Sequence, residues 1–262
     1  IGSAVGFGNI WRFPYLAYKH GGGAFLFPYL IALCVLGLPL LIMELSIGQK
    51  LQKGAVCAFK AIHPRLRGIG FLAVCCSFFV VIYYAVVMSW AALYFVRSFS
   101  SELPWQASPE NYFFNSVLNI SDSISILGEV NLQLLAALFA VWLIIYFCIQ
   151  KGVKSIGKVV LITVPLPIIL LLIIFFRSIF LEGAWEGIYY YICPNFDALF
   201  SAEIWEAAIS QILFTCSIGM GIMIAYASFA KPTSDMLKSG MIILFTDAII
   251  SVFAGFVVFA VM

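Results

Sequence analysis

The chain has 262 residues, of which 64% are hydrophobic and 10% are charged, and its formal net charge is +2. Soluble domains carry about 25% charged residues, so this chain has too few charges to cover a surface exposed to water. The small net charge also argues against a nucleic-acid-binding protein. The composition therefore predicts an integral membrane protein that has the lipid bilayer as a partner. Because the sequence begins and ends inside apolar segments, we expect it to be part of a longer chain.

Seven apolar segments predict the transmembrane organisation, since a helix that spans a bilayer needs about 20 mostly apolar residues. They are residues 1–18, 24–47, 69–96, 132–149, 159–176, 204–230 and 241–262, within a single transmembrane domain, 1–262. The loops alternate in charge: one side carries ten basic residues and one acid, and the other carries three basic residues and nine acids. Cytoplasmic loops are enriched in Lys and Arg, so we expect a multi-pass protein of the cell (cytoplasmic) membrane with a cytoplasmic N-terminal end. The large loop, residues 98–130, is then extracytoplasmic.

Three charged residues lie well inside predicted spans: Arg12, Glu44 and Asp247. Glu206, near the start of the sixth span, is counted with the adjoining loop. A charge at the centre of a membrane helix costs about 2.5–3.5 kcal/mol on insertion scales, so such residues usually have a functional role. Arg12 could instead extend to the outer surface, and Glu44 could be a structural acid that accepts a hydrogen bond. Asp247 has no Lys or Arg within reach along its own helix, so a bound cation is its simplest partner.

The first and sixth spans are predicted to break at glycines. The motifs are Gly6-Phe-Gly8 and Gly219-Met-Gly221, each in an apolar run beside polar side chains. Small residues also allow close helix packing in membranes, so neither motif is decisive alone. The pair is more informative, because glycine-interrupted segments at matching places in two halves of a chain indicate the midplane site of a transporter. The spacing fits two five-helix repeats, with residues 1–180 as the first and 204–262 as the start of the second.

Several longer motifs allow the sequence to be compared with a known protein family. Residues 2–15 read Gly-Ser-Ala-Val-Gly-Phe-Gly-Asn-Ile-Trp-Arg-Phe-Pro-Tyr, residues 21–29 read Gly-Gly-Gly-Ala-Phe-Leu-Phe-Pro-Tyr, and residues 37–40 and 44–49 read Gly-Leu-Pro-Leu and Glu-Leu-Ser-Ile-Gly-Gln. These motifs strongly resemble the opening of the neurotransmitter:sodium symporter (NSS) family, whose structural prototype is the bacterial amino-acid transporter LeuT. The likeness continues at residues 83–84, 151–155, 226–229 and 254–256, so it covers essentially the whole chain.

The resemblance implies an all-α polytopic membrane protein with a LeuT-type inverted-repeat fold, truncated after the seventh transmembrane helix. The implied activity is secondary active transport by alternating access, in which a neutral, hydrophobic amino acid enters the cell together with Na⁺. Such a protein is not an enzyme. A family member for another small carboxylated amine is the alternative within the family.

Two sodium sites are implied by the resemblance. The first uses oxygen atoms at the positions of Ala4, Asn9, Thr215 and Asp247, together with the substrate carboxylate. Hard oxygen ligands suit a small cation. The set contains no soft ligand that would favour a transition metal. The second uses carbonyls at the positions of Gly2 and Val5, but its other ligands belong to an eighth span. Only half of the second site is therefore expected in this chain.

The substrate carboxylate is expected at the amides of Phe7 and Gly8 in the unwound first span and at the hydroxyl of Tyr84, as suits an anion at helix-end N–H groups. Without the resemblance, Tyr84 is equally well interpreted as a buried ring with a satisfied hydroxyl. Monoamine carriers of the family hold an Asp at the position of Gly6, so Gly6 favours a substrate with its own carboxylate. The expected substrate-binding residues are Ser3, Ala4, Gly6, Phe7, Gly8, Val80, Tyr84, Phe214, Thr215, Ser217 and Met220.

The pocket for the substrate side chain is expected to be mostly apolar, with walls formed by Val80, Phe214, Ser217 and Met220. Apolar walls with one hydroxyl suit a neutral, hydrophobic amino acid, although the same residues would serve as ordinary helix packing. Arg12 matches the outer-gate arginine of the family, whose acidic partner lies beyond this sequence.

The residues that bear on chloride dependence give conflicting indications. Tyr29, Gln211 and Ser251 match positions that hold chloride in chloride-dependent members, so they form a candidate chloride or charge site. Asp247 occupies a place that is Asn in those members, and its carboxylate supplies the negative charge that chloride would supply. We therefore expect that chloride is not required.

The seven cysteines show no metal-ligand spacing and predict no disulfide framework. The outer loop also lacks the Cys pair of animal members, so we expect a prokaryotic member in which the glycosylation sequon at Asn119 is a coincidence. Two other classes are disfavoured. His20 and His63 lie in loops on opposite sides, and no span contains a His-Glu-x-x-His or Ser–His pair, which argues against an intramembrane enzyme. A seven-span retinal-type sensor needs a Schiff-base Lys in its last span, and residues 241–262 contain none.

Overall fold

A computed structural model describes residues 2, 4–121, 123, 125–126, 128–194 and 196–262. These residues are mostly helical, and apart from an isolated bridge between Gly22 and Pro194 they form no β-structure. With η denoting a π- or 3₁₀-helix, the elements are η1 (Gly8–Arg12), α1 (Phe13–Lys19), α2 (Gly23–Ala32), η2 (Leu33–Gly37), α3 (Leu38–Leu51), α4 (Ala55–Ile62), η3 (Pro64–Leu66), α5 (Arg67–Arg97), α6 (Pro109–Asn111), η4 (Tyr112–Leu118), α7 (Leu132–Ile149), α8 (Val153–Thr163), α9 (Pro165–Ser178), α10 (Ala184–Ile192), η5 (Phe196–Phe200), α11 (Ala202–Thr215), α12 (Ile222–Ala227) and α13 (Met236–Phe259).

Five helical stretches among the described residues are long and apolar enough to cross a membrane. They are Gly23–Leu51, Pro64–Arg97, Leu132–Ile149, Ser155–Ser178 and Met236–Phe259. They correspond to the second, third, fourth, fifth and seventh predicted spans. The other two predicted spans contain η1 with α1 and α11 with α12. The helix of the first begins at Gly8, within its glycine motif, and that of the sixth is interrupted between Thr215 and Ile222, so neither forms one long helix. The predicted all-α class is confirmed, whereas the seven-span topology and the repeat boundaries stay predictions.

The chain separates into two compact units, which are described individually below. The first unit comprises residues 1–77 and 160–262, and the second comprises residues 78–159. The division passes through the middle of α5, so it does not coincide with the predicted boundary between repeats.

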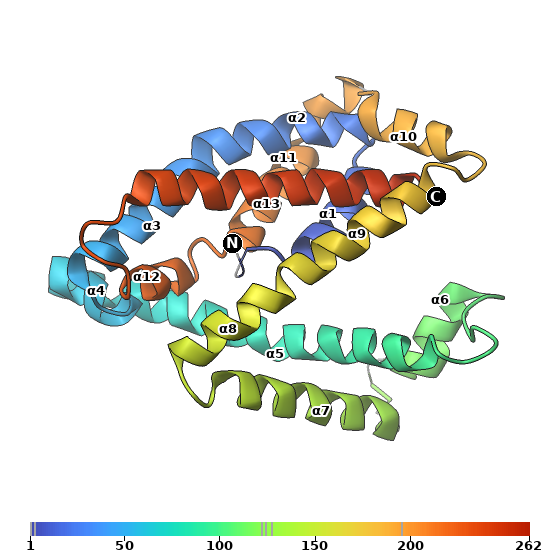
Figure 1. Cartoon of the computed structure of the whole chain (residues 1–262), viewed down its shortest axis with the longest axis horizontal. Coiled ribbons are helices and arrows are strands. Elements are labelled where there is room, and N and C mark those ends of the chain that lie inside the picture. The colour runs from blue at the N-terminus through green and yellow to red at the C-terminus, as the bar shows by residue number, and fades with distance from the viewer. Residues whose placement is uncertain (1, 3, 122, 124, 127, 195) are drawn as a thin grey trace. The chain divides into compact units, whose positions relative to one another are not determined.

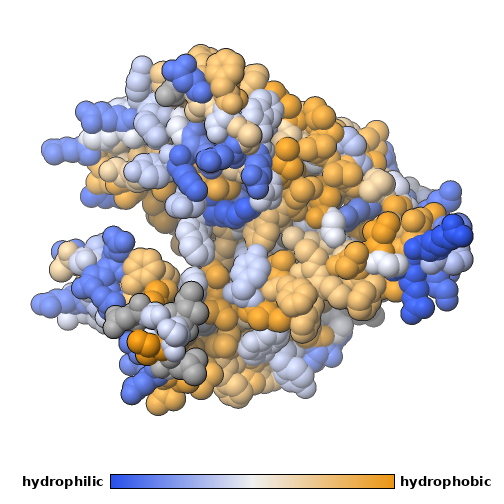
Figure 2. Space-filling model, turned by 180° about the vertical axis from the view of Figure 1, so that it is seen from behind, coloured by the Kyte–Doolittle hydropathy of each residue, from blue (hydrophilic) through white to orange (hydrophobic). Residues whose placement is uncertain are grey.

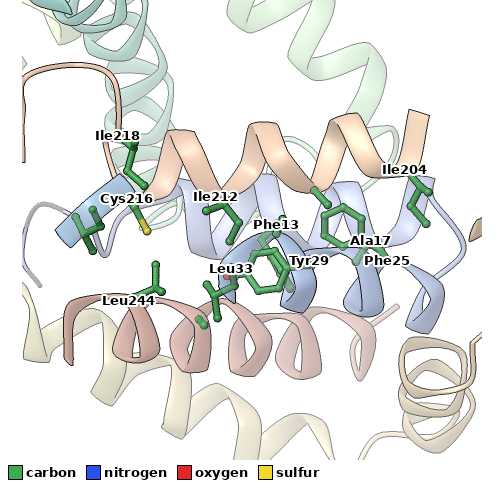
Figure 3. Close-up of a cluster of buried hydrophobic side chains, with 14 of the residues drawn as sticks. Phe13, Ala17, Phe25, Tyr29, Leu33, Ile204, Ile212, Cys216, Ile218 and Leu244 are labelled. Atoms are coloured by element: carbon green, nitrogen blue, oxygen red, sulfur yellow. The ribbon is translucent and has the colours of Figure 1, made fainter. Parts of the chain in front are cut away.

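The core of the first unit lies among α1, α2, α3, α11 and α13 (Figure 1). Its centre is aromatic: the ring of Phe13 meets Phe25 and Tyr29 edge-on, with centroids 5.6 and 4.8 Å apart. Figure 3 shows these three rings gathered between the ribbons of α11 and α13. Edge-to-face pairs are stabilising beyond the area that they bury, so the aromatic cluster fixes how α1 and α2 pack together.

Two irregular helical turns each precede a proline. The N–H of Phe13 donates to the carbonyl of Gly8 in η1, and the N–H of Leu38 donates to the carbonyl of Leu33 in η2. Both bonds join residues five apart, and the next residue is Pro14 or Pro39, which has no N–H to donate. The wider turn is therefore a local consequence of the proline.

Close backbone packing joins α12 to α3. A Cβ on Gly48 would overlap the carbonyl of Ile224, so only glycine permits this approach. Just beyond, the side chain of Gln49 donates to the carbonyls of Lys231 and Ser234 at 2.8 and 2.7 Å. The loop between α12 and α13 is thereby attached to the end of α3.

Helix α10 packs in a similar way against the end of α13. The ring of Tyr191 stacks on Phe259 with centroids 4.7 Å apart, and its hydroxyl donates to the carbonyl of Val252 at 3.1 Å. Burial raises the pKa of this hydroxyl, so it remains a donor at neutral pH. A Cβ on Gly255 would overlap the Tyr191 ring, and one on Gly187 would overlap the Phe259 carbonyl.

Gly187→Ala is therefore expected to displace α10 from α13 and to lower the thermal unfolding temperature of the purified protein in detergent. Overpacking of this kind costs about 1–3 kcal/mol. Gly68→Ala on α5 is the control, since its Cβ would meet no atom within 4 Å. Equal unfolding temperatures for the two variants would contradict the packing described here.

The second unit is held together around an aromatic group. The rings of Trp105 and Tyr112 lie 4.9 and 5.9 Å from that of Tyr94, and the guanidinium of Arg97 lies over Tyr112. Asn131 caps α7 by accepting hydrogen bonds from the two N–H groups of residues 133 and 134, and it also donates to the carbonyl of residue 117. Asn131 thus joins the start of α7 to η4.

Much of the outer surface is apolar. Large side chains that are more than half exposed include Ile173, Phe176 and Ile249. Hydrophobic residues cover broad areas of the face drawn in Figure 2. Exposed apolar surface on this scale is expected of a protein surrounded by lipid.

Candidate functional site

The sixth predicted span is broken, as its glycine motif predicts. Helix α11 ends at Thr215 and α12 begins at Ile222. Between them Ser217, Gly219 and Gly221 have φ angles of 53°, 81° and 70°. This left-handed region is unfavourable for residues with a Cβ, and glycine adopts it without that cost. The two glycines therefore allow the chain to leave the helix inside an apolar run.

The first predicted span begins with non-helical residues 4–6, and Phe7 is the N-cap of η1. Asn9 fixes this start: its Oδ1 accepts from the N–H of Gly6 at 2.8 Å, and its own N–H donates to the Gly6 carbonyl at 3.1 Å. The expectation that Phe7 and Gly8 are unwound is thus wrong in detail, because the Asn9 bonds start the helix at this point. Their amides lie at a helix N-terminus, which still favours an anion.

Asn9 and Asp247 form the centre of a buried polar cluster, and both are 0% exposed. The Nδ2 of Asn9 lies 2.7 Å from Oδ1 of Asp247, 3.2 Å from its carbonyl and 2.8 Å from Oγ of Ser251. On the other side of the carboxylate, Sγ of Cys216 lies 3.8 Å from Oδ2. Since an amide has only two N–H hydrogens, Asn9 alone cannot donate a full hydrogen bond to all three of these acceptors.

Gln211 connects α11 to η1. The side-chain Nε2 of Gln211 donates to the carbonyl of Gly8 at 2.9 Å. The main-chain carbonyl of Gln211 accepts from the hydroxyl of Thr215, also at 2.9 Å. Arg12 donates to Oε1 of Gln211 at 3.0 Å and to Oγ of Ser210 at 2.8 Å. The guanidinium also lies 5.0 Å from the centre of the Phe214 ring, a cation–π geometry. Arg12 is thus held against α11, the first helix of the sixth predicted span.

The hydroxyl of Tyr29 is buried beside this cluster. It faces Ser251 and Asp247 but makes no hydrogen bond of normal geometry with a described residue. A buried hydroxyl without a partner is costly, so this group indicates that the cluster lacks one polar or ionic component.

Glu44 accepts a hydrogen bond at the break in span six. Its Oε1 lies 2.7 Å from the N–H of Gly219, and its Oε2 is buried without a partner among the described residues. The carboxyl borders a largely apolar cavity of about 510 Å³, whose walls include Met43, Phe59 and Leu72. These contacts match the structural acceptor that the sequence left open for Glu44.

The remaining predicted residues are distributed as follows. Ala4 is buried, Val5 packs against the cluster of Leu171 and Ile250, and the hydroxyl of Ser77 donates to the carbonyl of Met220 at 2.6 Å. Gly2 lies so close to α8 that a Cβ would overlap Val160. Val80 and Tyr84 lie one turn apart on α5, in the second unit. Ser3 lies outside the described residues.

Two residues of the cluster were not predicted as site residues. Cys216 contacts Asp247, and Ser210 binds Arg12. Each adjoins a predicted residue in the sequence, Thr215 or Gln211, and that adjacency is the only signal that could have identified them.

Comparisons with known proteins cover the whole chain. The model of a family described as "Sodium:neurotransmitter symporter family" matches residues 1–110 and 106–262. The Homo sapiens "Sodium- and chloride-dependent transporter XTRP3" is 38% identical over 279 residues, which are 100% of this chain and 47% of that protein. The Torpedo marmorata "Creatine transporter" is 37% identical over 292 residues, 100% of this chain and 48% of that protein.

A third relative is the Mus musculus "Sodium-dependent neutral amino acid transporter B(0)AT3", which is 38% identical over 280 residues, 100% of this chain and 46% of that protein. The chain thus spans about half the length of the curated relatives that it matches. All three come from animals, and the prokaryotic source stays a prediction.

Proposed function

Because the chain belongs to the sodium:neurotransmitter symporter family, we propose that it forms the first half of a carrier that takes up a neutral amino acid together with Na⁺. The chain is an integral membrane protein, and its relatives are sodium-dependent transporters rather than enzymes. The observation that carries the proposal is the buried contact between Asn9 and Asp247, which joins the first and seventh spans.

Sodium is the ion that this cluster suits. Asp247 is fully buried, and the side chains near its carboxylate among the described residues, Asn9, Thr215 and Cys216, are all uncharged. A buried carboxylate without a cation costs several kcal/mol, so binding of Na⁺ would be favourable. We assign the first sodium site to oxygens of Ala4, Asn9, Thr215 and Asp247, and half of a second to carbonyls of Gly2 and Val5.

The substrate is proposed to be a neutral, hydrophobic amino acid. Gly6 leaves the first span without a side-chain carboxylate, so the substrate must supply the anion that faces the amides of Phe7 and Gly8. The mouse relative is named as a neutral amino acid transporter, which supports this class. The creatine transporter of Torpedo marmorata makes another small carboxylated amine the second candidate.

Orientation and chloride dependence are also proposals. The charge asymmetry of the loops supports a cytoplasmic N-terminal end and an outer loop at residues 98–130. The carboxylate of Asp247 supports transport without chloride, even though the human relative is named as sodium- and chloride-dependent.

The test is uptake of radiolabelled neutral amino acids into vesicles by a carrier of full family length that contains this chain. Replacing Na⁺ by choline should abolish uptake, and unchanged uptake in choline would refute sodium coupling. The 262-residue chain alone is the negative control, because alternating access needs one set of helices to move against the other.

Tyr84→Phe tests recognition of the substrate carboxylate. If the hydroxyl binds this group, the variant should weaken binding of every amino acid by roughly tenfold to a hundredfold, since a hydrogen bond to a charged group contributes about 1.5–3 kcal/mol. Competition assays with several amino acids measure this, with Tyr83→Phe as the control from the adjacent position. A change in side-chain preference without a general loss would assign Tyr84 to the side-chain pocket instead.

A further inference from the structure

The two carboxylate oxygens of Asp247 have unequal hydrogen-bond partners. Oδ1 lies 2.7 Å from Nδ2 of Asn9, whereas Oδ2 has the thiol of Cys216 at 3.8 Å. The hydroxyl of Thr215 is also near the carboxylate, but its one hydrogen is donated to the main-chain carbonyl of Gln211 at 2.9 Å. An amide N–H is a strong donor and a thiol is a weak one. Oδ2 is therefore the oxygen for which a cation meets less competition.

Asn9 cannot easily turn to change this arrangement. Its Oδ1 accepts from the N–H of Gly6 at 2.8 Å, which fixes the orientation of the amide and directs Nδ2 towards Asp247 and Ser251. A carbonyl oxygen has two acceptor positions, so Oδ1 of Asn9 can keep this bond and still contact an ion. The availability of the cluster for a cation thus depends mainly on Oδ2 of Asp247.

A second observation independently indicates a missing ligand. The hydroxyl of Tyr29 is buried, faces Asp247 and Ser251, and has no hydrogen bond of normal geometry. Tyr29 and Cys216 are both drawn in Figure 3, within the packed region between α11 and α13. The cluster is accordingly built for one more group than the side chains supply.

We propose that Cys216 sets the sodium affinity of this site, because its thiol contacts Oδ2 of Asp247 without competing strongly for it. The proposal rests on the assignment of the first sodium site above. A serine here would offer the carboxylate an O–H donor, and hydrogen bonds between a hydroxyl and a carboxylate are short and strong. Sodium would have to displace that bond, so Cys216 is a positioning residue whose weak donor strength is its function.

Cys216→Ser and Cys216→Ala distinguish this role from packing. Cys216 is 0% exposed and belongs to the main hydrophobic core. If it only fills space, Ala should perturb the site at least as much as Ser, because Ala leaves the larger void. If it sets the sodium affinity, Ser should require roughly three- to tenfold more sodium, whereas Ala should require the same amount or less.

Two readouts are measured on a carrier of full family length that contains this chain. One is the sodium concentration for half-maximal amino-acid uptake, and the other is the rise in thermal unfolding temperature as NaCl replaces choline chloride without substrate. The second readout reports binding alone, because a ligand stabilises the folded state that binds it. Cys34→Ser, at an exposed thiol in η2, is the matched control and should change neither midpoint.

The outcomes distinguish failure of the proposed function from failure of the inference about Cys216. If neither readout of the unsubstituted carrier depends on sodium, the proposed function fails and this inference with it. If sodium dependence is present but the Ser variant has the unsubstituted midpoint, or the Ala variant shifts upward as much as Ser, the inference alone is overturned. If the Ser variant does not fold, the Ala variant still tests the proposal. A sodium midpoint of the Ala variant above that of the unsubstituted carrier contradicts the proposal.

Discussion

Asp247→Asn is expected to raise the sodium concentration for half-maximal uptake by about tenfold or more. The Asn side chain keeps an oxygen ligand but removes the negative charge, and interactions with charged groups are worth about 1.5–3 kcal/mol, where 1.4 kcal/mol is a factor of ten. Added chloride should restore part of the lost sodium affinity, since an anion near Tyr29, Gln211 and Ser251 would replace the missing charge.

The measurement is sodium-dependent uptake by both proteins, with gluconate replacing chloride in a parallel series. Asp235→Asn is the control on the same helix: Asp235 caps α13 by accepting from the N–H of Lys238, and Asn retains that cap. If the unsubstituted carrier already requires chloride, or if Asp247→Asn binds sodium normally without it, the charge-substitution account is wrong.

Glu44→Leu is expected to destabilise the break in span six and to abolish transport. The N–H of Gly219 would lose its carboxylate acceptor, and an unsatisfied buried donor costs about 1–3 kcal/mol. Thr215, which ends α11, and Ser217, which lies within the break, belong to the proposed sites, so disorder in the break should also weaken sodium and substrate binding.

Glu44→Gln is the matched control, because its amide carbonyl can still accept from Gly219. We expect this variant to retain most of the thermal stability in detergent and a measurable uptake rate. If Glu44→Leu unfolds at the same temperature as the unsubstituted carrier, or if Gln is as damaging as Leu, the hydrogen bond to Gly219 is not what Glu44 contributes.

The sequence by itself determined the class of the protein and the break in its sixth span. Charged residues are too few for a soluble surface, and this follows from composition alone. The break at residues 216–221 follows from Gly219 and Gly221, because positive φ is a local property of a residue and needs no knowledge of the neighbouring helices.

The family motifs predicted more residues of the candidate site than helical periodicity could. They predicted that Asn9, Thr215 and Asp247 share one site. Asn9 and Asp247 do contact each other although they are separated by 238 positions, and the site itself stays a proposal. They did not identify which atoms meet. That the Asn9 amide turns its donors towards Asp247, while its oxygen is held by Gly6, depends on how η1 packs against α13.

Only the tertiary structure revealed the roles of residues whose type carries no strong signal. Cys216 is one of seven cysteines, and nothing in its spacing distinguishes it from the others. Its importance arises because the end of α11 places its thiol beside Oδ2 of Asp247. For Glu44, the sequence predicted a structural acceptor, but only the structure identifies its donor as the N–H of Gly219, 175 positions away. Such contacts are set by the packing of whole helices against one another, and amino-acid composition and helical periodicity constrain which face is buried but not which atoms meet there.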